Sequence, residues 1–250
     1  ITYLKSGGVQ FRMFDPLLKS KHFYLGRRLH HKVVAIDSTY ALVGGINISD
    51  RYNDMPGQPA WMDWAVYTNG EVSATLAAIC HERVLAPTLK SMVRKQKKFN
   101  LQPVGSPVSI KINDWVRRKK QITPSYLAMV RQARQSIIIM SAYFLPNGQF
   151  RNELRRAVKR GVDVKLILAG TSDVMVAKHA ERYMYRWLLK NDIQIYEYQK
   201  TVLHGKVAVY DGKWATVGSF NVNNISAYAS IELNLAVDHP VFAHQVESAL

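Results

Sequence analysis

The sequence contains a single cysteine and no long apolar run. Cys80 has no second thiol to pair with, so an intramolecular disulfide is excluded and a cytosolic setting is the default. The residue lies on the apolar face of a helical pattern over residues 71–84, which favours a buried structural thiol over a nucleophile. No segment approaches the roughly 18 to 20 apolar residues of a membrane span, and no signal peptide opens the sequence. We therefore expect a soluble or peripheral protein.

Acidic residues are also scarce. There are 18 of them against 34 lysines and arginines, which gives a formal net charge of +16. This excess predicts a polyanionic partner, either nucleic acid or an anionic membrane surface. Basic clusters occur at residues 94–98 and 117–120, and Trp115 precedes the second, an arrangement that suits a lipid headgroup layer. A solvated charged face explains either cluster equally well when it is taken alone.

From residue 108 onward, the sequence alternates between strand and helix patterns. Apolar runs predict strands at residues 108–113, 136–144, 162–169, 193–198 and 203–210. Apolar spacing predicts helices at residues 124–135, 148–161 and 171–192. Thr123 is the expected N-cap of the first helix, and Gly161 is expected to end the second. Alternation of this kind predicts an α/β layered sheet.

The first half of the sequence repeats only the end of this series. Residues 3–14 align with residues 188–198, and a motif shared by both halves follows each segment. Because the repeat begins in mid-unit, we expect that N-terminal residues and a shorter C-terminal piece are missing. Three residues that break regular structure mark the boundary between the units: Pro103, Gly105 and Pro107.

The shared motif consists of polar landmarks at equal spacing. Residues 29–47 read LHHKVVAIDSTYALVGGIN, and residues 203–221 read LHGKVAVYDGKWATVGSFN. The landmarks that recur are His30 and His204, Lys32 and Lys206, Asp37 and Asp211, Gly44 and Gly218, and Asn47 and Asn221. A duplicated scaffold kept for stability would explain the glycines, which we expect to permit tight turns. It would not explain why histidine, lysine and asparagine persist on the side away from the core.

Strand alternation places the motif histidine and lysine of each copy on one face and the motif aspartate on the other. We therefore expect Asp37 and Asp211 to be scaffold groups that hold backbone or basic partners. His31 points away from the histidine–lysine face, at the position that Gly205 occupies in the second copy. His31 is accordingly expected to be structural.

The repeated motif resembles that of the phospholipase D superfamily, whose members bring two HKD motifs together across a pseudo-twofold axis. The flanking segments LGRRLHHKVV, VGGINISDRYND, IQIYEY and ATVGS look most like those of bacterial cardiolipin synthases. The resemblance covers essentially the whole chain. It implies two α/β/α lobes, residues 1–106 and 107–250, with the active site at their interface. It also implies a scaffold role for the residues that close the motifs: Gly44, Gly45, Gly218 and Ser219.

The resemblance implies a two-histidine reaction on a phosphodiester. One neutral imidazole attacks phosphorus and forms a phosphohistidine, while the other, protonated, donates its proton to the leaving alkoxide. The sequence does not decide between them, and analogy with the family favours His30 as the nucleophile and His204 as the acid and base. The groups implied to bind the phosphate are Lys32, Lys206, Asn47 and Asn221. No cofactor is implied, and the eight histidines show neither an HExxH pattern nor Cys/His ligand spacing.

Each histidine also needs a carboxylate to fix its tautomer and favour its charged form. The family places one acid downstream of each motif and crosses the two between the lobes. By position, the implied pairs are His30 with Glu232 and His204 with Asp63. Asp63 follows its motif asparagine by 16 residues, whereas Glu232 follows its own by 11. Three alternatives to Asp63 therefore remain: Asp50, Asp54 and Glu71.

The function that the resemblance implies is a phosphatidyltransferase acting on phosphatidylglycerol, with cardiolipin and glycerol as products. Its expected partners are an anionic phospholipid and the cytoplasmic side of the bacterial cell membrane, bound peripherally, and an anchor in a missing N-terminal part is compatible with this. The alternatives are a lipid hydrolase, a nuclease of the same fold and a binding protein without activity. Both motifs are intact at every reacting position, which argues against an inactive protein.

Overall fold

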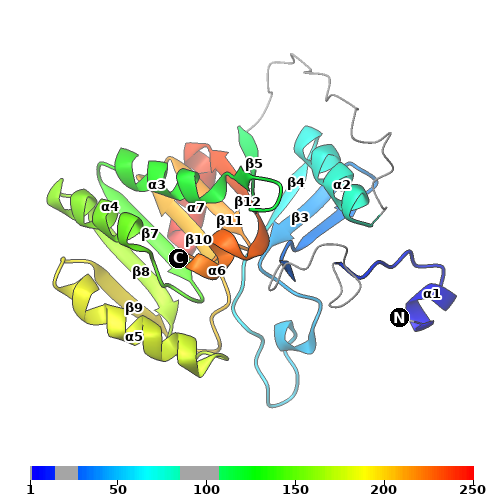
Figure 1. Ribbon diagram of the computed structural model, residues 1–250, viewed down its shortest axis with the longest axis horizontal. Helices are drawn as coiled ribbons and strands as arrows, with labels where there is room; N and C mark the ends of the chain where they lie inside the picture. The colour runs from blue at the N-terminus through cyan, green and yellow to red at the C-terminus, as the bar shows by residue number, and fades with distance from the viewer. Residues whose placement is uncertain (1, 15–27, 85–106) are drawn as a thin grey trace.

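The computed structural model describes residues 2–14, 28–84 and 107–250, and it contains one large and one small sheet (Figure 1). The large sheet has the strand order β6-β5-β12-β11-β10-β7-β8-β9, and β1 pairs with β12 outside this path. The small sheet has the order β2-β3-β4. The strands β7, β8 and β9 are parallel, and the other pairs of the main path are antiparallel. The mixed α/β class predicted from the sequence is confirmed.

The strands and helices have the following bounds, in chain order. The strands are β1 (Arg28–Leu29), β2 (Val33–Ile36), β3 (Tyr40–Gly44), β4 (Ala65–Asn69), β5 (Val108–Asp114), β6 (Lys119–Lys120), β7 (Ser136–Ser141), β8 (Asp163–Ala169), β9 (Gln194–Tyr198), β10 (Lys206–Tyr210), β11 (Trp214–Gly218) and β12 (Ser230–Asp238). The helices are α1 (Thr2–Ser6), α2 (Glu71–Val84), α3 (Ile122–Gln132), α4 (Gly148–Lys159), α5 (Met175–Leu189), α6 (Asn224–Tyr228) and α7 (Pro240–Ala249), with a 3-10 turn η1 (Asp50–Tyr52).

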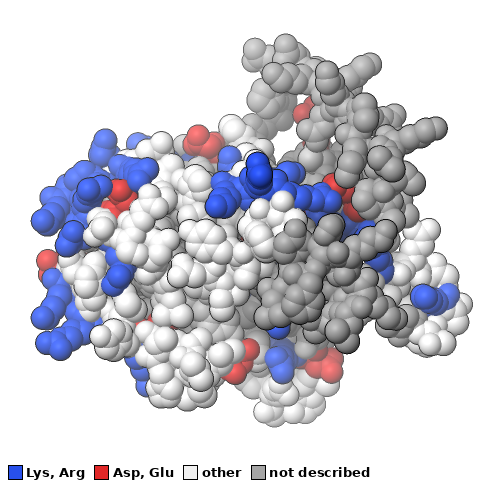
Figure 2. All heavy atoms as spheres, in the orientation of Figure 1, with Lys and Arg blue, Asp and Glu red and all other residues white. Residues whose placement is uncertain are grey.

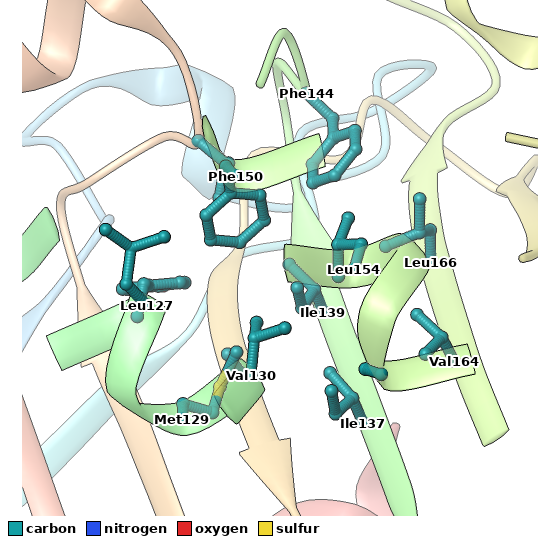
Figure 3. Packing of buried hydrophobic residues seen from close by; sticks show 14 of the residues in the cluster. Leu127, Met129, Val130, Ile137, Ile139, Phe144, Phe150, Leu154, Val164 and Leu166 are labelled. Atoms are coloured by element: carbon teal, nitrogen blue, oxygen red, sulfur yellow. The ribbon is translucent and has the colours of Figure 1, made fainter. Parts of the chain in front are cut away.

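Helices cover both faces of the large sheet. On one face, α3, α4 and α5 pack over β7, β8 and β10, and α7 lies behind the sheet (Figure 1). Figure 3 shows the first of these interfaces, where side chains of α3 and α4 meet those of β7 and β8. Its labelled members are Leu127, Met129, Val130, Ile137, Ile139, Phe144, Phe150, Leu154, Val164 and Leu166. Because strand side chains alternate, Ile137 and Ile139 face these helices, whereas Met140 joins the α7 core.

The small sheet and α2 pack against the large sheet. Ala41 and Val43 of β3 and Leu76 of α2 form one buried cluster with Leu233 and Leu235 of β12. The opposite face of the small sheet exposes large apolar side chains: Val34, Ile36, Tyr40, Leu42 and Tyr67. Within the described ranges, no helix is long and apolar enough to cross a membrane.

Two local expectations are wrong. Thr123 lies inside the first turn of α3 and does not cap it, because Asn113 of β5 supplies the cap from outside the helix. Its Oδ1 accepts the Ile122 N–H at 2.9 Å, and its Nδ2 donates to Thr123 Oγ1 at 3.3 Å. Residues 9–13, which align with a strand of the second half, belong to no strand. The basic cluster at 94–98 and most of the expected boundary lie outside the described residues.

Candidate active site

Two short parallel pairings join the halves of the chain at the motif histidines. The His30 N–H donates to the carbonyl of Ile231 at 2.9 Å, where β1 runs parallel to the start of β12. The His204 N–H donates to the carbonyl of Met62 at 2.7 Å, beside a parallel bridge between Met62 and Leu203. In each case, the accepting residue directly precedes an acid of the other half. The backbone therefore brings each histidine to the acid that the family resemblance implied for it.

The two acids contact the histidines in the crossed pairing that was expected. Glu232 Oε2 lies 2.8 Å from His30 Nδ1, and Asp63 Oδ2 lies 2.7 Å from His204 Nδ1. Both carboxylate side chains are only 1% exposed. A buried carboxylate on Nδ1 holds the proton on that nitrogen and leaves Nε2 as the reactive atom of each ring. These contacts confirm the pairing, and the catalytic roles of the residues remain a proposal.

The three alternative acids lie elsewhere. Asp50, Asp54 and Glu71 are all exposed. Asp54 accepts the backbone N–H of Ala60 at 2.9 Å, and Glu71 begins α2. Asp63 is thus the acid at His204, although the interval that precedes it differs from that before Glu232.

The side chain of each motif lysine hydrogen-bonds the backbone carbonyl of the histidine in its own motif. Lys32 Nζ donates to the carbonyl of His30 at 3.0 Å, and Lys206 Nζ donates to the carbonyl of His204. Burial lowers the pKa of each lysine to about 8, against the attraction of Asp63 and Glu232, which raises it. Each lysine therefore interacts with acids from both halves. Two ammonium groups and two carboxylates form one electrostatic cluster around the histidines.

The two histidines differ in exposure. The His30 side chain is 31% exposed and the His204 side chain only 10%. Burial lowers the pKa of His204, whereas its hydrogen bond with Asp63 raises it, and the positive charges of Lys206 and Lys32 lower it further. The second histidine is therefore the more enclosed of the pair.

A small residue follows the motif glycine in each half, for different reasons. Ser219 Oγ donates to Glu232 Oε2, the same oxygen that contacts His30. At the matching position in the first half, a Cβ on Gly45 would lie 2.3 Å from Asp63 Oδ1. The serine thus orients one acid, and the glycine leaves room for the other.

The motif glycines permit close approach of strands, and the tight-turn explanation is wrong. Neither residue has a positive φ. A Cβ on Gly44 would lie 2.1 Å from the carbonyl oxygen of Trp64, and one on Gly218 would lie 2.5 Å from that of Leu233. Each glycine ends a strand beside the segment that carries an acid. The absence of a side chain therefore lets that acid reach the site.

The motif aspartates lie at turns, away from the reacting groups. Asp37 and Asp211 both have positive φ, of 50° and 49°. The carboxylate of Asp211 accepts the backbone N–H groups of residues 134, 135 and 136 at 2.7 to 2.9 Å, so its scaffold role is supported by contacts. Asp37 is exposed.

His31 is a second structural residue of the motif. Burial is the main cause that lowers the pKa of its ring to about 3, with the charge of Arg83 lowering it further. The ring hydrogen-bonds the backbone of Glu232, which raises the pKa but does not offset the burial. A neutral ring beneath Glu232 agrees with the expected structural role.

The motif asparagines have different surroundings. Asn221 is buried, its backbone N–H donates to Ser226 Oγ at 3.3 Å, and its Oδ1 has no partner among the described residues. Asn47 is exposed, and its Nδ2 donates to Tyr52 Oη at 2.9 Å. One N–H of Asn47 is therefore already used within the protein.

An aromatic wall that the sequence analysis missed lies against His204. Tyr52 Oη is 3.0 Å from His204 Nδ1, and the rings of Tyr52 and Trp61 lie 5.8 and 6.0 Å from the imidazole. Arg51 stacks over Trp61 at 4.9 Å. The signal in the sequence was the longer interval between Asn47 and Asp63.

No group of three or more histidine, cysteine or acidic side chains in the described part of the chain could hold a metal ion.

Comparison with known proteins identifies relatives of the whole chain. The family model described as "Cardiolipin synthase, PLD-like domain" matches residues 126–250. Cardiolipin synthase B of Salmonella typhi is 36% identical over 96% of this chain and 59% of its own length. Cardiolipin synthase B of Escherichia coli K12 is 34% identical over 95% of this chain and 59% of its own length. The chain thus spans about three fifths of these relatives.

A solved structure extends the comparison to the fold. The crystal structure of phosphatidylserine synthase from Haemophilus influenzae Rd KW20 superposes with a TM-score of 0.71 at 14% identity. The match covers 89% of this chain and 61% of that protein. At this identity, the likeness shows a shared fold and nothing finer.

Proposed function

Because this chain belongs to the cardiolipin synthase family with a phospholipase D-like domain, we propose that it is the catalytic part of a phosphatidyltransferase. The donor is phosphatidylglycerol, the acceptor is a second lipid hydroxyl, and the products are cardiolipin and glycerol. The observation that carries the proposal is the crossed pairing of two histidines with two buried acids, beside the buried Lys206 and the half-buried Lys32. This arrangement supports a lobe boundary near residue 106, with one half-site from each side of it.

The first step forms a phosphohistidine. Nε2 of one imidazole attacks phosphorus, and the bond from phosphorus to the leaving glycerol oxygen breaks as that oxygen takes the Nε2 proton of the other imidazole. Because His30 is the more exposed ring, we assign the attack to His30 and the proton transfer to His204. Lys32 and Lys206 neutralise the non-bridging oxygens.

The second step transfers the phosphatidyl group. His204 Nε2, now neutral, takes the proton of the acceptor hydroxyl, whose oxygen attacks phosphorus while the bond to His30 Nε2 breaks. Asn47 and Asn221 complete the phosphate-binding groups through their amides. Both histidines return to their starting protonation states, so the cycle balances without a metal ion or a cofactor.

Basic residues support peripheral binding to an anionic membrane. They lie at the end of the large sheet where the two histidines meet their acids, which we call the site edge. β5 ends at this edge, because Asn113 pairs with Glu232, and the basic turn at residues 117–120 follows directly. Arg118, Lys119 and Lys120 are exposed. Figure 2 shows a second gathering of lysine and arginine over the end of the molecule where α4 and α5 lie, and the proposed lipid contacts do not include it. The proposed surface is the cytoplasmic leaflet, which is rich in anionic lipid.

The full cluster at residues 117–120 is not free to bind lipid. Arg117 donates to Glu82 at 2.5 Å and lies 3.9 Å from Asp114. Arg117 therefore serves the fold, and the proposed lipid contacts fall on the other three basic residues.

The proposal is tested with purified protein and vesicles of phosphatidylglycerol. We expect cardiolipin and free glycerol in nearly equal amounts, and loss of both products in His30→Ala and His204→Ala. Phosphatidic acid as the main product would assign the protein to the lipid hydrolases. Cleavage of DNA without action on lipid would place it among the nucleases.

A further inference from the structure

The segment between Asn47 and Asp63 has no equivalent of equal length in the second half. Asp63 follows Asn47 by 16 positions, whereas Glu232 follows Asn221 by 11. The longer segment contains the turn η1 and a loop that returns to the site at Trp61. The two half-sites are therefore built differently, although their motifs match.

Tyr52 is the residue through which this segment contacts the site. Its Oη lies 3.0 Å from His204 Nδ1, the nitrogen that Asp63 Oδ2 contacts at 2.7 Å. Asn47 Nδ2 donates to the same Oη at 2.9 Å. One hydroxyl thus links a motif residue of the first half to a motif residue of the second.

The protons of this cluster can be assigned from the types of group. An ionised carboxylate only accepts hydrogen bonds, so the short contact with Asp63 requires a proton on His204 Nδ1. Tyr52 Oη then accepts a second, bifurcated hydrogen bond from the same N–H, and it also accepts a hydrogen bond from Asn47 Nδ2. Two acceptors therefore converge on Nδ1 and hold the ring with Nε2 available for proton transfer. The other charges acting on this ring are those of Lys206 and Lys32.

The second half offers His30 no such contact. Ser226 follows Asn221 by the five residues that separate Tyr52 from Asn47. Its Oγ accepts the backbone N–H of Asn221 at 3.3 Å. Among the described residues, the hydrogen bond of His30 Nδ1 is to Glu232.

The loop holds Tyr52 in place through contacts of its own. The Trp61 N–H donates to the carbonyl of Arg51 at 2.7 Å, and the rings of Tyr52 and Trp61 are 5.9 Å apart. The Met62 N–H donates to the carbonyl of Val202 at 2.9 Å, which fixes the end of the loop beside His204. The tyrosine is therefore fixed from both sides of its segment.

We propose that Tyr52 is a positioning residue that acts through His204, and that its segment makes His204 the proton-transferring histidine of the pair. The kinetic part of this inference rests on the proposed function. The geometric part does not, because the state of the His204 ring can be measured without a substrate.

The test uses Tyr52→Phe, which removes the hydroxyl and keeps the aromatic ring against Trp61 and His204. The ring signals of both histidines are followed by NMR as a function of pH and assigned with His30→Ala and His204→Ala. Because a hydrogen-bond acceptor on Nδ1 favours the charged ring, we expect the pKa of His204 to fall and that of His30 to stay. Tyr67→Phe removes an exposed tyrosine hydroxyl of the same half and is the matched control.

Kinetics with a phosphodiester whose leaving group needs a proton complete the test. The loss of one neutral hydrogen bond predicts a fall in kcat of about 3- to 10-fold with little change in KM. An unchanged His204 titration, or equal shifts of both histidines, would overturn the positioning role. A wild-type protein without any phosphodiester activity, but with the expected change at His204, would reject the proposed function and leave the role of Tyr52 intact.

Discussion

At the scale of single residues, the two motif aspartates show that equal positions in a repeat need not have equal contacts. The carboxylate of Asp211 accepts three backbone N–H groups at the start of β7, whereas Asp37 is exposed. Their shared positive φ explains why both copies keep a residue that tolerates this conformation. The aspartate of the second motif, Asp211, therefore has a structural role.

Asp211→Asn should lower the free energy of unfolding by about 1–3 kcal/mol, because the amide offers one acceptor oxygen where the carboxylate offers two. Asn keeps the tolerance for positive φ, so backbone strain does not contribute. The measurement is urea unfolding, with Asp37→Asn as the matched control, expected within about 0.5 kcal/mol of wild type. Equal effects of the two substitutions would contradict the scaffold role of Asp211.

The effect of Asp211 should also depend on pH. Burial raises the pKa of Asp211, but the hydrogen bonds from the three backbone amides outweigh it, and the pKa is lowered overall. A lowered pKa in the folded state means that the carboxylate stabilises the fold fully above the pKa of the unfolded state. This contribution is lost as the pH falls through the folded pKa. The difference between wild type and Asp211→Asn should therefore shrink in acid.

The motif lysines predict an alkaline limit to activity. Burial lowers the pKa of Lys32 and Lys206 to about 8, so both lose positive charge above that pH. Because kcat/KM reports groups of the free enzyme, its profile with a soluble phosphodiester should fall above about pH 8. The exposed Lys213 provides a control, since Lys213→Gln should leave this limb unchanged. A profile that stays flat well above pH 8 would contradict the lysine assignment.

At the scale of elements, periodicity predicted most of the second half. The strands and helices expected from residue 108 onward all occur, with differences at their ends. The N-terminus of α3 differs because its cap comes from Asn113, on a neighbouring strand, and local patterns do not contain this contact. The strand expected at 203–210 begins at Lys206, since His204 instead bonds the backbone of Met62.

Gly218→Ala tests the proposed reason for the motif glycines. A Cβ there would lie 2.5 Å from the carbonyl oxygen of Leu233 and from the Cα of Asn234, so β11 and β12 must separate. We expect a loss of about 1–3 kcal/mol in the free energy of unfolding, together with lower activity as Glu232 moves.

The matched control is Gly148→Ala, at the start of α4, where a Cβ meets nothing within 4 Å. It should be neutral or stabilise by up to about 1 kcal/mol. Both proteins are compared by urea unfolding, and a Gly218→Ala protein as stable as Gly148→Ala would reject this explanation.

At the scale of the whole molecule, the family resemblance of the repeated motif predicted which residues meet, although they are far apart in the chain. His30 and Glu232 are 202 residues apart, and His204 and Asp63 are 141 apart. No local pattern reports such contacts, and the crossed pairing came from resemblance to a family. The contact of Tyr52 was not predicted, because it lies where the two copies differ and the repeat gives no guide.

The site edge of the large sheet should be the part that meets an anionic membrane. Each basic residue near such a surface contributes on the order of 1 kcal/mol, so replacing Arg118, Lys119 and Lys120 by glutamine should weaken vesicle binding by up to about 100-fold. Turnover of a soluble phosphodiester should change little, because these residues do not contact the histidines. The difference in binding should fade at high salt, since screening removes it.

A charge-matched control comes from the opposite edge of the same sheet. Lys159 ends α4, Lys190 caps α5 and Lys213 lies in the turn after β10, each at the far end of an element that begins near the site. Replacing these three by glutamine removes the same charge from the molecule. If only net charge attracted the protein to vesicles, both triple variants would bind equally weakly. Weaker binding of the site-edge variant alone, measured by co-sedimentation with phosphatidylglycerol vesicles, would show that the protein docks with its histidines toward the lipid. Equal binding would mean that the membrane contact lies elsewhere on the molecule.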